Sequence, residues 1–173
     1  MAQLINFSIK LQPSILLIGK QIRYSMQAHM QGDNRMPAFW QACFAQDTFA
    51  PLEAQGSFLY DDAYVGTMTD WDKGDGDFSY IVGMLMKPGA TIPQGYAAKP
   101  LPTCQVAIGY IKGKDTQDVC AHAHALTEAA LRKAGHKCDA IPWCMERYGE
   151  AFAMPDADGD IVLDYYIPLD GKI

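Results

Sequence analysis

The stretch IPWCMERYG, residues 141–149, places an acid, Glu146, inside a segment with the apolar composition of a buried β-strand. Alternate side chains of a pleated strand share a face, so Cys144, Glu146 and Tyr148 are expected on one side. Trp143 then points to the other side. Burying a carboxylate without a partner costs several kcal/mol. The sequence therefore predicts that something pairs with Glu146.

Two kinds of chemistry suit such a carboxylate. It can bind a ligand cation, or, with its pKa raised by burial, it can act as a general acid or base on an electrophile or its attacking water. The structural alternative is an ion pair with Arg23 or with groups across the sheet near Arg147. Cys144 is a poor candidate nucleophile, because the neighbouring negative charge of Glu146 disfavours its thiolate.

Other side chains of metal-ligating type have the wrong spacing for a metal site. Cys120, His122 and His124 lie on a predicted helix, where positions i and i+2 point apart. The aspartates within 70–77 and 156–160 resemble calcium loops, but neither run has glycine sixth and glutamate twelfth. We interpret both runs as hairpin turns and expect neither a metal nor a cofactor.

The composition is that of a soluble globular protein, with 173 residues, 49% of them apolar and 20% charged. A net charge of -6 with scattered Lys and Arg argues against a nucleic-acid surface and favours a cationic or neutral partner. Five cysteines without a CxxC motif indicate reduced thiols. No signal peptide or membrane span of about 18 apolar residues is visible. We expect a cytoplasmic protein that does not enter a membrane.

The same order of elements is predicted twice. The first half has a strand at 15–26, a short helix within 36–49, and a hairpin of 63–71 with 78–87. A stretch rich in Pro and Gly, 87–102, is interpreted as a linker. The second half has a strand at 103–113, a helix at 116–135 with Thr116 as its N-cap and Gly135 as its C-cap, and a hairpin of 141–149 with 160–169.

This order predicts an α+β fold in a single domain, residues 1–173, with halves of about 1–90 and 100–173. Neither strand-helix-strand-strand module can bury the face of its sheet alone. We therefore expect two modules related by a pseudo-twofold axis, an antiparallel sheet with both main helices on one face, and a central cleft between the halves.

Several segments together resemble one known family. They are MPAFWQACF (36–44), YVGTMTDWD (64–72) followed by FSYIVG (78–83), IPQGYAAKPLP (92–102), and WCMERYG (143–149) followed by DYYIPL (164–169). In this order they resemble the GyrI-like small-molecule-binding family, also found as the effector-binding domain of AraC-type and MerR-type regulators. The resemblance runs from about Pro13 to Leu169, and it implies paired strand-helix-strand-strand modules.

The resemblance also implies a site. In drug-binding members the acid of the Glu-x-Tyr strand lies at the floor of an aromatic cleft and meets a ligand cation, and here that acid is Glu146. The aromatic faces attract a cation by roughly 0.5 to 2 kcal/mol per contact. The candidate walls are Trp40, Trp71, Tyr80, Trp143 and Tyr148, of which Trp143 fits least because alternation places it opposite Glu146.

The resemblance leaves the activity open. Stand-alone members bind drugs, inhibit gyrase or hydrolyse strained cyclopropane rings, and in a hydrolase Glu146 would act with Tyr80 and Tyr148. The chain contains no helix-turn-helix segment, so we expect no direct nucleic-acid binding. The expected partner is a hydrophobic or cationic small molecule, with DNA gyrase or a separate transcription regulator as further alternatives.

Overall fold

The computed structural model of the protein describes residues 1–71, 73–137 and 142–169. Its contacts divide the chain into two compact units, one of residues 1–13 with 103–173 and the other of residues 14–102. We call these the outer unit and the inner unit, after their places in the sequence.

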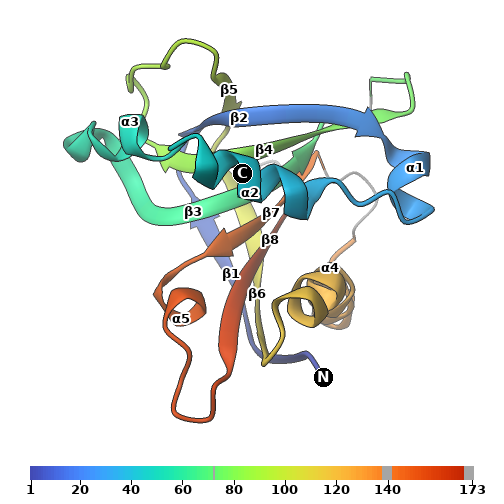
Figure 1. The fold of residues 1–173 in the computed structure, drawn as a ribbon. Helices are drawn as coiled ribbons and strands as arrows, with labels where there is room; N and C mark the ends of the chain where they lie inside the picture. The colour runs from blue at the N-terminus through green and yellow to red at the C-terminus, as the bar shows by residue number, and fades with distance from the viewer. Residues whose placement is uncertain (72, 138–141, 170–173) are drawn as a thin grey trace. The chain divides into compact units, whose positions relative to one another are not determined.

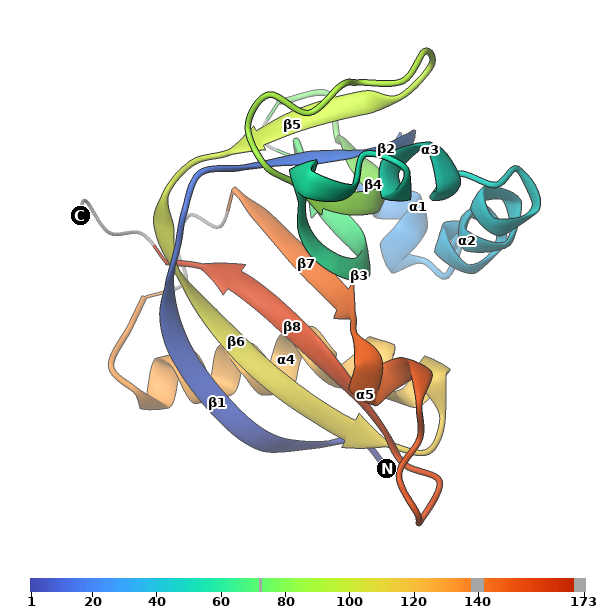
Figure 2. The ribbon, with the colours of Figure 1, turned by 90° about the vertical axis from the view of Figure 1, so that its left-hand side faces the viewer.

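The outer unit contains β1 (Gln3–Gln12), β6 (Cys104–Gly113), α4 (Thr116–Lys133), β7 (Trp143–Tyr148), α5 (Glu150–Ala153) and β8 (Ile161–Pro168). Its strands lie in the order β1-β6-β8-β7, and the pairings of β6 with β1 and of β8 with β6 and β7 are antiparallel. In Figure 2, α4 crosses behind β6 and β8, while α5 follows the end of β7. One face of this sheet is therefore covered by α4.

The inner unit contains β2 (Ile15–Ser25), α1 (Met26–Met30), α2 (Met36–Ala45), α3 (Ala50–Glu53), a 3-10 turn η1 (Gly56–Phe58), β3 (Leu59–Thr69), β4 (Asp77–Met86) and β5 (Ala97–Leu101). Its strands lie in the order β3-β4-β2-β5, again with antiparallel pairings. Figure 1 shows α1, α2 and α3 on the connection between β2 and β3. Each unit is thus a strand-helix-strand-strand module with one added strand beside its first strand.

The predicted α+β class, with antiparallel strands and the repeated module, is confirmed. The sequence analysis did not predict the added strands. β1 was not assigned, and β5 lies inside the stretch interpreted as a linker. Pro100 is compatible with β5 because a proline is tolerated in an edge strand, where its missing N–H is not needed. The predicted strand position Ile141 lies outside the described residues.

Capping explains where α4 begins and ends. The N-cap is Asp115, not the predicted Thr116, and its carboxylate accepts a hydrogen bond from Asp118 N at 2.8 Å. Lys133 in the last turn complements the helix dipole, and Gly135 follows with φ of 87°, which favours glycine.

Close packing of α4 on the sheet depends on Gly109 in β6. A Cβ at this position would overlap Thr127 Oγ1 and would lie 2.9 Å from Thr127 Cβ. Val119, Ala123, Thr127 and Leu131 form the buried stripe of the helix. The glycine therefore sets how closely helix and sheet approach.

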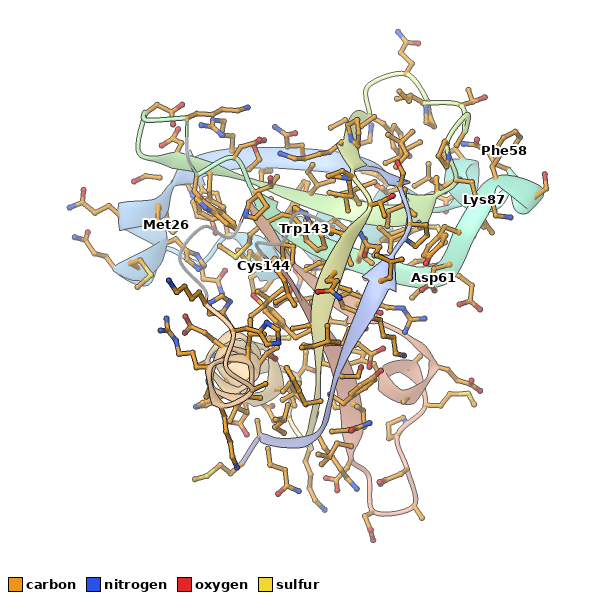
Figure 3. The ribbon with its side chains drawn as sticks, turned by 180° about the vertical axis from the view of Figure 1, so that it is seen from behind. Met26, Phe58, Asp61, Lys87, Trp143 and Cys144 are labelled. Atoms are coloured by element: carbon orange, nitrogen blue, oxygen red, sulfur yellow. The ribbon has the colours of Figure 1, made fainter. Side chains whose placement is uncertain are left out.

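The core of the inner unit lies between its helices and one face of β4. Alternate residues of that strand, including Phe78, Tyr80 and Val82, belong to one buried cluster with Cys43 of α2 and Leu52 of α3. At one end of this unit, η1 is tied to the residue after β4: Lys87 N donates to Phe58 O at 2.7 Å, and Lys87 Nζ donates to Ser57 O at 2.8 Å. Phe58 and Lys87 are labelled in Figure 3.

The acidic loop between β7 and β8 is a turn, as predicted. Asp156 Oδ1 accepts from the backbone nitrogens of Asp158 and Asp160 at 2.9 and 3.0 Å. Lys112 of β6 lies 2.8 Å from Asp156 Oδ2 and 3.2 Å from Asp160 Oδ2. A lysine ammonium thus balances the acids of this loop. Among the described residues, no helix is both long and apolar enough to cross a membrane.

Candidate functional site

Glu146 lies on the face of the outer sheet that α4 covers. It pairs with Tyr165 of β8, whose hydroxyl lies 3.1 Å from Nδ1 of His124 on α4. Tyr148, two residues along β7, donates its hydroxyl hydrogen to Glu146 Oε2 at 3.0 Å. The predicted shared face of Glu146 and Tyr148 is confirmed. Both side chains are half-buried, so the carboxylate is restrained but not sealed from solvent.

Cys120 of α4 extends this pair. Its Sγ lies 3.6 Å from the Tyr148 hydroxyl oxygen. Burial, with a smaller contribution from the negative charge of Glu146, raises the pKa of the Cys120 thiol to about 12, although the contact with Tyr148 acts in the opposite direction. Cys120 is therefore a neutral thiol at pH 7. It packs against the carboxylate-phenol pair and does not act as a nucleophile.

Cys144 lies on the same face as Glu146 and is 5% exposed. Burial and, to a smaller extent, the charge of Glu146 raise the pKa of its thiol to about 12, although a hydrogen bond with Tyr165 acts in the opposite direction. The prediction that Cys144 is a poor nucleophile agrees with this environment.

Phe152 of α5 contacts Tyr148 from the side. The two rings are 4.7 Å apart between centroids and nearly perpendicular, at 85°. This edge-to-face contact holds the phenol in the orientation that reaches Glu146. The short helix in the β7-β8 connection, which the sequence analysis did not predict, thus supports the candidate site.

Trp40 and Tyr80 are brought together within the inner unit. Trp40 Nε1 on α2 donates to the Tyr80 hydroxyl oxygen on β4 at 2.9 Å. Tyr80 is 1% exposed, whereas Trp40 is half-buried. The hydrogen bond satisfies the polar ends of both rings, which would otherwise be costly to bury.

The other two predicted tryptophans lie in apolar surroundings. Trp143 is 2% exposed and, by strand alternation, points away from the face of Glu146, as expected. It is labelled with its neighbour Cys144 in Figure 3. Trp71, which follows β3, packs against the core of the inner unit.

Arg23, considered as a structural partner of Glu146, has an ion pair of its own, and so does Arg147. Arg23 Nη2 lies 2.7 Å from Asp75 Oδ2, and Arg147 Nη1 lies 2.9 Å from Asp164 Oδ2. Within residues 1–71, 73–137 and 142–169, no group of three or more His, Cys, Asp or Glu side chains is arranged to hold a metal ion. The described side chains therefore offer a carboxylate-phenol pair and aromatic rings.

His124, whose spacing from Cys120 and His122 does not suit a metal site, is half-buried against the outer sheet. Its ring Nδ1 meets the Tyr165 hydroxyl at 3.1 Å, and the two rings are perpendicular, at 87°. Burial lowers the pKa of the His124 imidazole, which favours its neutral form at pH 7. His124 therefore joins α4 to the sheet beside the Glu146 position.

Repeated strand-helix-strand-strand modules with antiparallel strands define the α+β class of this protein. The chain belongs to the GyrI-like small molecule binding domain family, whose model matches residues 5–170. This confirms the family resemblance seen in the sequence. A search of curated proteins gave no match.

Solved structures share the fold at low sequence identity. A protein assigned to bacterial transcription regulation from Staphylococcus aureus MU50 is 15% identical, with a TM-score of 0.67 over 96% of this chain and 99% of that one. SAV2435 bound to tetraphenylphosphonium is 13% identical, with a TM-score of 0.69 over 96% and 95%. An integron cassette protein of Vibrio cholerae is 13% identical, with a TM-score of 0.62 over 97% and 98%. At these identities the likeness shows the fold alone.

Sequence reasoning missed the supporting residues Cys120, Phe152 and Tyr165. Cys120 and Tyr148 are 28 positions apart and meet because α4 packs on the face of the outer sheet that carries Tyr148. Nothing in their spacing indicates this contact. The alternation that placed Tyr148 beside Glu146 acts within one strand, and it was the only site contact that the sequence could predict.

Proposed function

We propose that this protein binds a hydrophobic, cationic or aromatic small molecule, with the carboxylate of Glu146 as the charge partner. The observation that carries the proposal is the hydrogen bond from Tyr148 to Glu146 Oε2 at 3.0 Å. It holds a half-buried carboxylate in one orientation. A partly desolvated, oriented carboxylate favours an organic cation over its neutral analogue.

Aromatic side chains are the second element of the proposal. The ring of Tyr148 lies beside the carboxylate and can attract a cation through its quadrupole. Trp40, Trp71, Tyr80 and Trp143 stay predictions of the family resemblance. Because Tyr80 and Trp143 are almost fully covered, a ligand would reach them only after neighbouring side chains moved. The fold neighbour SAV2435 was solved with tetraphenylphosphonium, a hydrophobic cation, which supports this ligand class.

The test is a calorimetric titration with methyltriphenylphosphonium and, as a neutral analogue, triphenylphosphine oxide. Glu146→Gln should weaken the binding of the cation by roughly 1 to 3 kcal/mol and leave the affinity for the oxide nearly unchanged. Glu150→Gln, at an exposed carboxylate four residues along, is the matched control and should bind like the wild type. Equal affinities for both compounds in wild type and Glu146→Gln would remove Glu146 from the site.

The same residue pair supports hydrolysis as a second candidate function. A carboxylate beside a phenol can activate water and donate a proton to an already reactive, electrophilic ring. Mass spectrometry after incubation with a cyclopropane-containing compound distinguishes the functions: an unchanged mass indicates a binder, and addition of one water indicates a hydrolase. If the protein is a hydrolase, Glu146→Gln should lower turnover by about a hundredfold or more while affinity is kept.

We also propose a cytoplasmic location, from the cysteine pattern of the sequence. In the part of the chain that the structure describes, Cys43, Cys104, Cys120 and Cys144 are free thiols, which suits a reducing compartment. DNA gyrase and a separate transcription regulator stay predictions of the family resemblance.

A further inference from the structure

The outer sheet ends at β1, which pairs with β6 along one side and with no described strand along the other. Figure 2 shows β1 at the border of this sheet, beside β6. The helix α4 contacts β1, but it lies against the face of the sheet and not beyond its edge. The backbone N–H and C=O groups along that edge are therefore open to pairing with another extended strand.

The edge strand of the inner unit, β5, is protected against such pairing. It has only five residues, and Pro100 removes one N–H from it. β1 has ten residues and no proline, and Lys10 is its single charged residue. The Lys10 ammonium lies 3.4 Å from the Tyr110 hydroxyl on β6, so it is directed back over the sheet and not out across the edge. β1 thus lacks most of the devices that protect an edge strand.

The exposed edge of β1 carries a row of apolar side chains. A bulge near the start of the strand leaves residues 6–12 as its regular part. Phe7, Ile9 and Leu11 alternate along this part, so they share one face of the strand. Phe7 pairs with Gly109, the residue that packs against α4, so this is the face that the helix covers. Leu11 is nevertheless 62% exposed, and the other two side chains are only half-buried.

We propose that β1 pairs with β1 of a second copy of the chain, antiparallel and centred on Ile9, so that two outer sheets become one continuous sheet. In this register Phe7 lies opposite the partner's Leu11, and Ile9 lies opposite the partner's Ile9. The apolar row of one copy continues into that of the other, and such cross-strand apolar pairs stabilise a sheet. None of these residues belongs to the proposed ligand site, so the inference stands apart from the proposed function.

The sequence of β1 favours a second copy as the occupant, because the same register suits both faces of the strand. On the other face Lys10 lies opposite the partner's Ser8, and Asn6 lies opposite the partner's Gln12. The two lysines therefore do not oppose each other, which would destabilise the pair. The contact uses the β1 edge of both copies and closes at two, since the proline of β5 prevents the pairing from continuing into a filament.

Sedimentation equilibrium of the full chain tests the proposal. A single strand pair is a small interface, so we expect dimers to form between about 10 µM and 1 mM. Leu11→Lys places a charge opposite the partner's Phe7 and should weaken the dimer by about tenfold or more. Ile92→Lys is the matched control, because Ile92 is 50% exposed in the connection between β4 and β5, and it should leave the dimer unchanged.

Two results of this measurement would overturn the proposal. One is a monomer over the whole concentration range, which would leave the edge of β1 to an extended segment of another protein. The other is a dimer that Leu11→Lys and Ile92→Lys weaken equally, which would mean that the copies meet through another surface.

Cysteine substitutions test the register. Directly opposite residues of an antiparallel pair have Cα atoms about 4.5 to 5.5 Å apart, within reach of a disulfide. Ile9→Cys should therefore cross-link two copies through position 9 on mild oxidation. Asn6→Cys is the control, because its two copies would lie about 20 Å apart and should not cross-link. Peptide mass spectrometry separates this disulfide from those of the native cysteines, and cross-linking of Asn6→Cys in place of Ile9→Cys would overturn the proposed pairing.

Discussion

Tyr148 donates a hydrogen bond to Glu146 from two positions along the same strand, with 3.0 Å between the phenol oxygen and Oε2. Same-face neighbours on a strand stand side by side, so this bond needs the phenol to lean toward the acid. Phe152 supports that orientation from one side, and Cys120 contacts the hydroxyl from α4. The carboxylate is thus restrained by groups from β7, α5 and α4.

The thiol of Cys120 should report the charge of Glu146. Because that charge raises the pKa of Cys120, Glu146→Gln should lower it and increase alkylation by iodoacetamide at pH 9. One pKa unit changes the thiolate fraction about tenfold, so a severalfold increase is expected. Tyr148→Phe removes a contact that lowers the pKa and should slow the reaction. Peptide-level mass spectrometry measures both rates.

The control for this experiment is Cys104, whose pKa is raised by burial alone. Its alkylation rate should be the same in wild type and both variants. If Cys120 reacted at the wild-type rate in Glu146→Gln, the two groups would not be electrostatically coupled as the structure has them.

Tyr64 should make stability fall at high pH. Its pKa is raised to about 12 in the folded protein, first by the hydrogen bond to Glu53, against 10.0 for the unperturbed group. Stability from this group is therefore complete below pH 10 and is lost as the pH rises toward 12. Glu53→Gln should bring the folded-state pKa of Tyr64 closer to 10. NMR titration with ¹³Cζ-labelled tyrosine checks this, and an unchanged Tyr64 curve would refute it.

Asp156 should make the stability of the folded protein fall at acid pH. The hydrogen bond from Lys112 lowers the pKa of Asp156 to about 2, from a model-compound value of 3.8. Its stabilising contribution is present above pH 3.8 and is lost as the pH falls toward 2. Lys112→Met should therefore lose less stability than the wild type between pH 4 and 2. Urea midpoints across this range measure the difference, which should shrink in an Asp156→Asn background, where Asp160 is the remaining carboxylate partner of Lys112.

How far the sequence predicted this fold depends on how local each signal was. Alternation predicted the shared face of Glu146 and Tyr148, and helix periodicity predicted α4, because both patterns are fixed by neighbouring residues. β1 has a comparable signal in the alternation of Phe7, Ile9 and Leu11, but this signal is short because a bulge between Leu4 and Asn6 shifts the register before it. β5 could not be predicted because Pro100 argues against a strand unless the strand is known to lie at the edge of the sheet.

The candidate sites were less predictable than the strands. Cys120 reaches Tyr148, and Trp40 reaches Tyr80, only through the packing of a helix on a sheet. Sequence spacing carries no information about such contacts until the register of helix and strand is known. The ring contacts of Phe49 with Trp40 and Tyr64 could not be predicted for the same reason, although Trp40 and Phe49 are close in sequence.

The last prediction concerns the contact between α4 and the outer sheet. Gly109→Ala should destabilise the protein by about 1 to 3 kcal/mol, since the new Cβ would overlap Thr127 Oγ1. That hydroxyl is buried and has no hydrogen-bond partner among the described residues. Thr127→Ala should therefore cost little alone and should recover part of the loss in the double variant. Urea denaturation of the four proteins gives the coupling energy.

Gly83 provides the contrasting case in the inner unit. A Cβ there would overlap the backbone oxygen of Ile18 and lie 2.6 Å from Gly19 Cα on the paired strand β2. Backbone atoms cannot be truncated, so no side-chain substitution should rescue Gly83→Ala, and Thr127→Ala should be additive with it. If the effects of Thr127→Ala and Gly109→Ala on stability were also additive, the side chain of Thr127 would not limit the approach of α4 to β6.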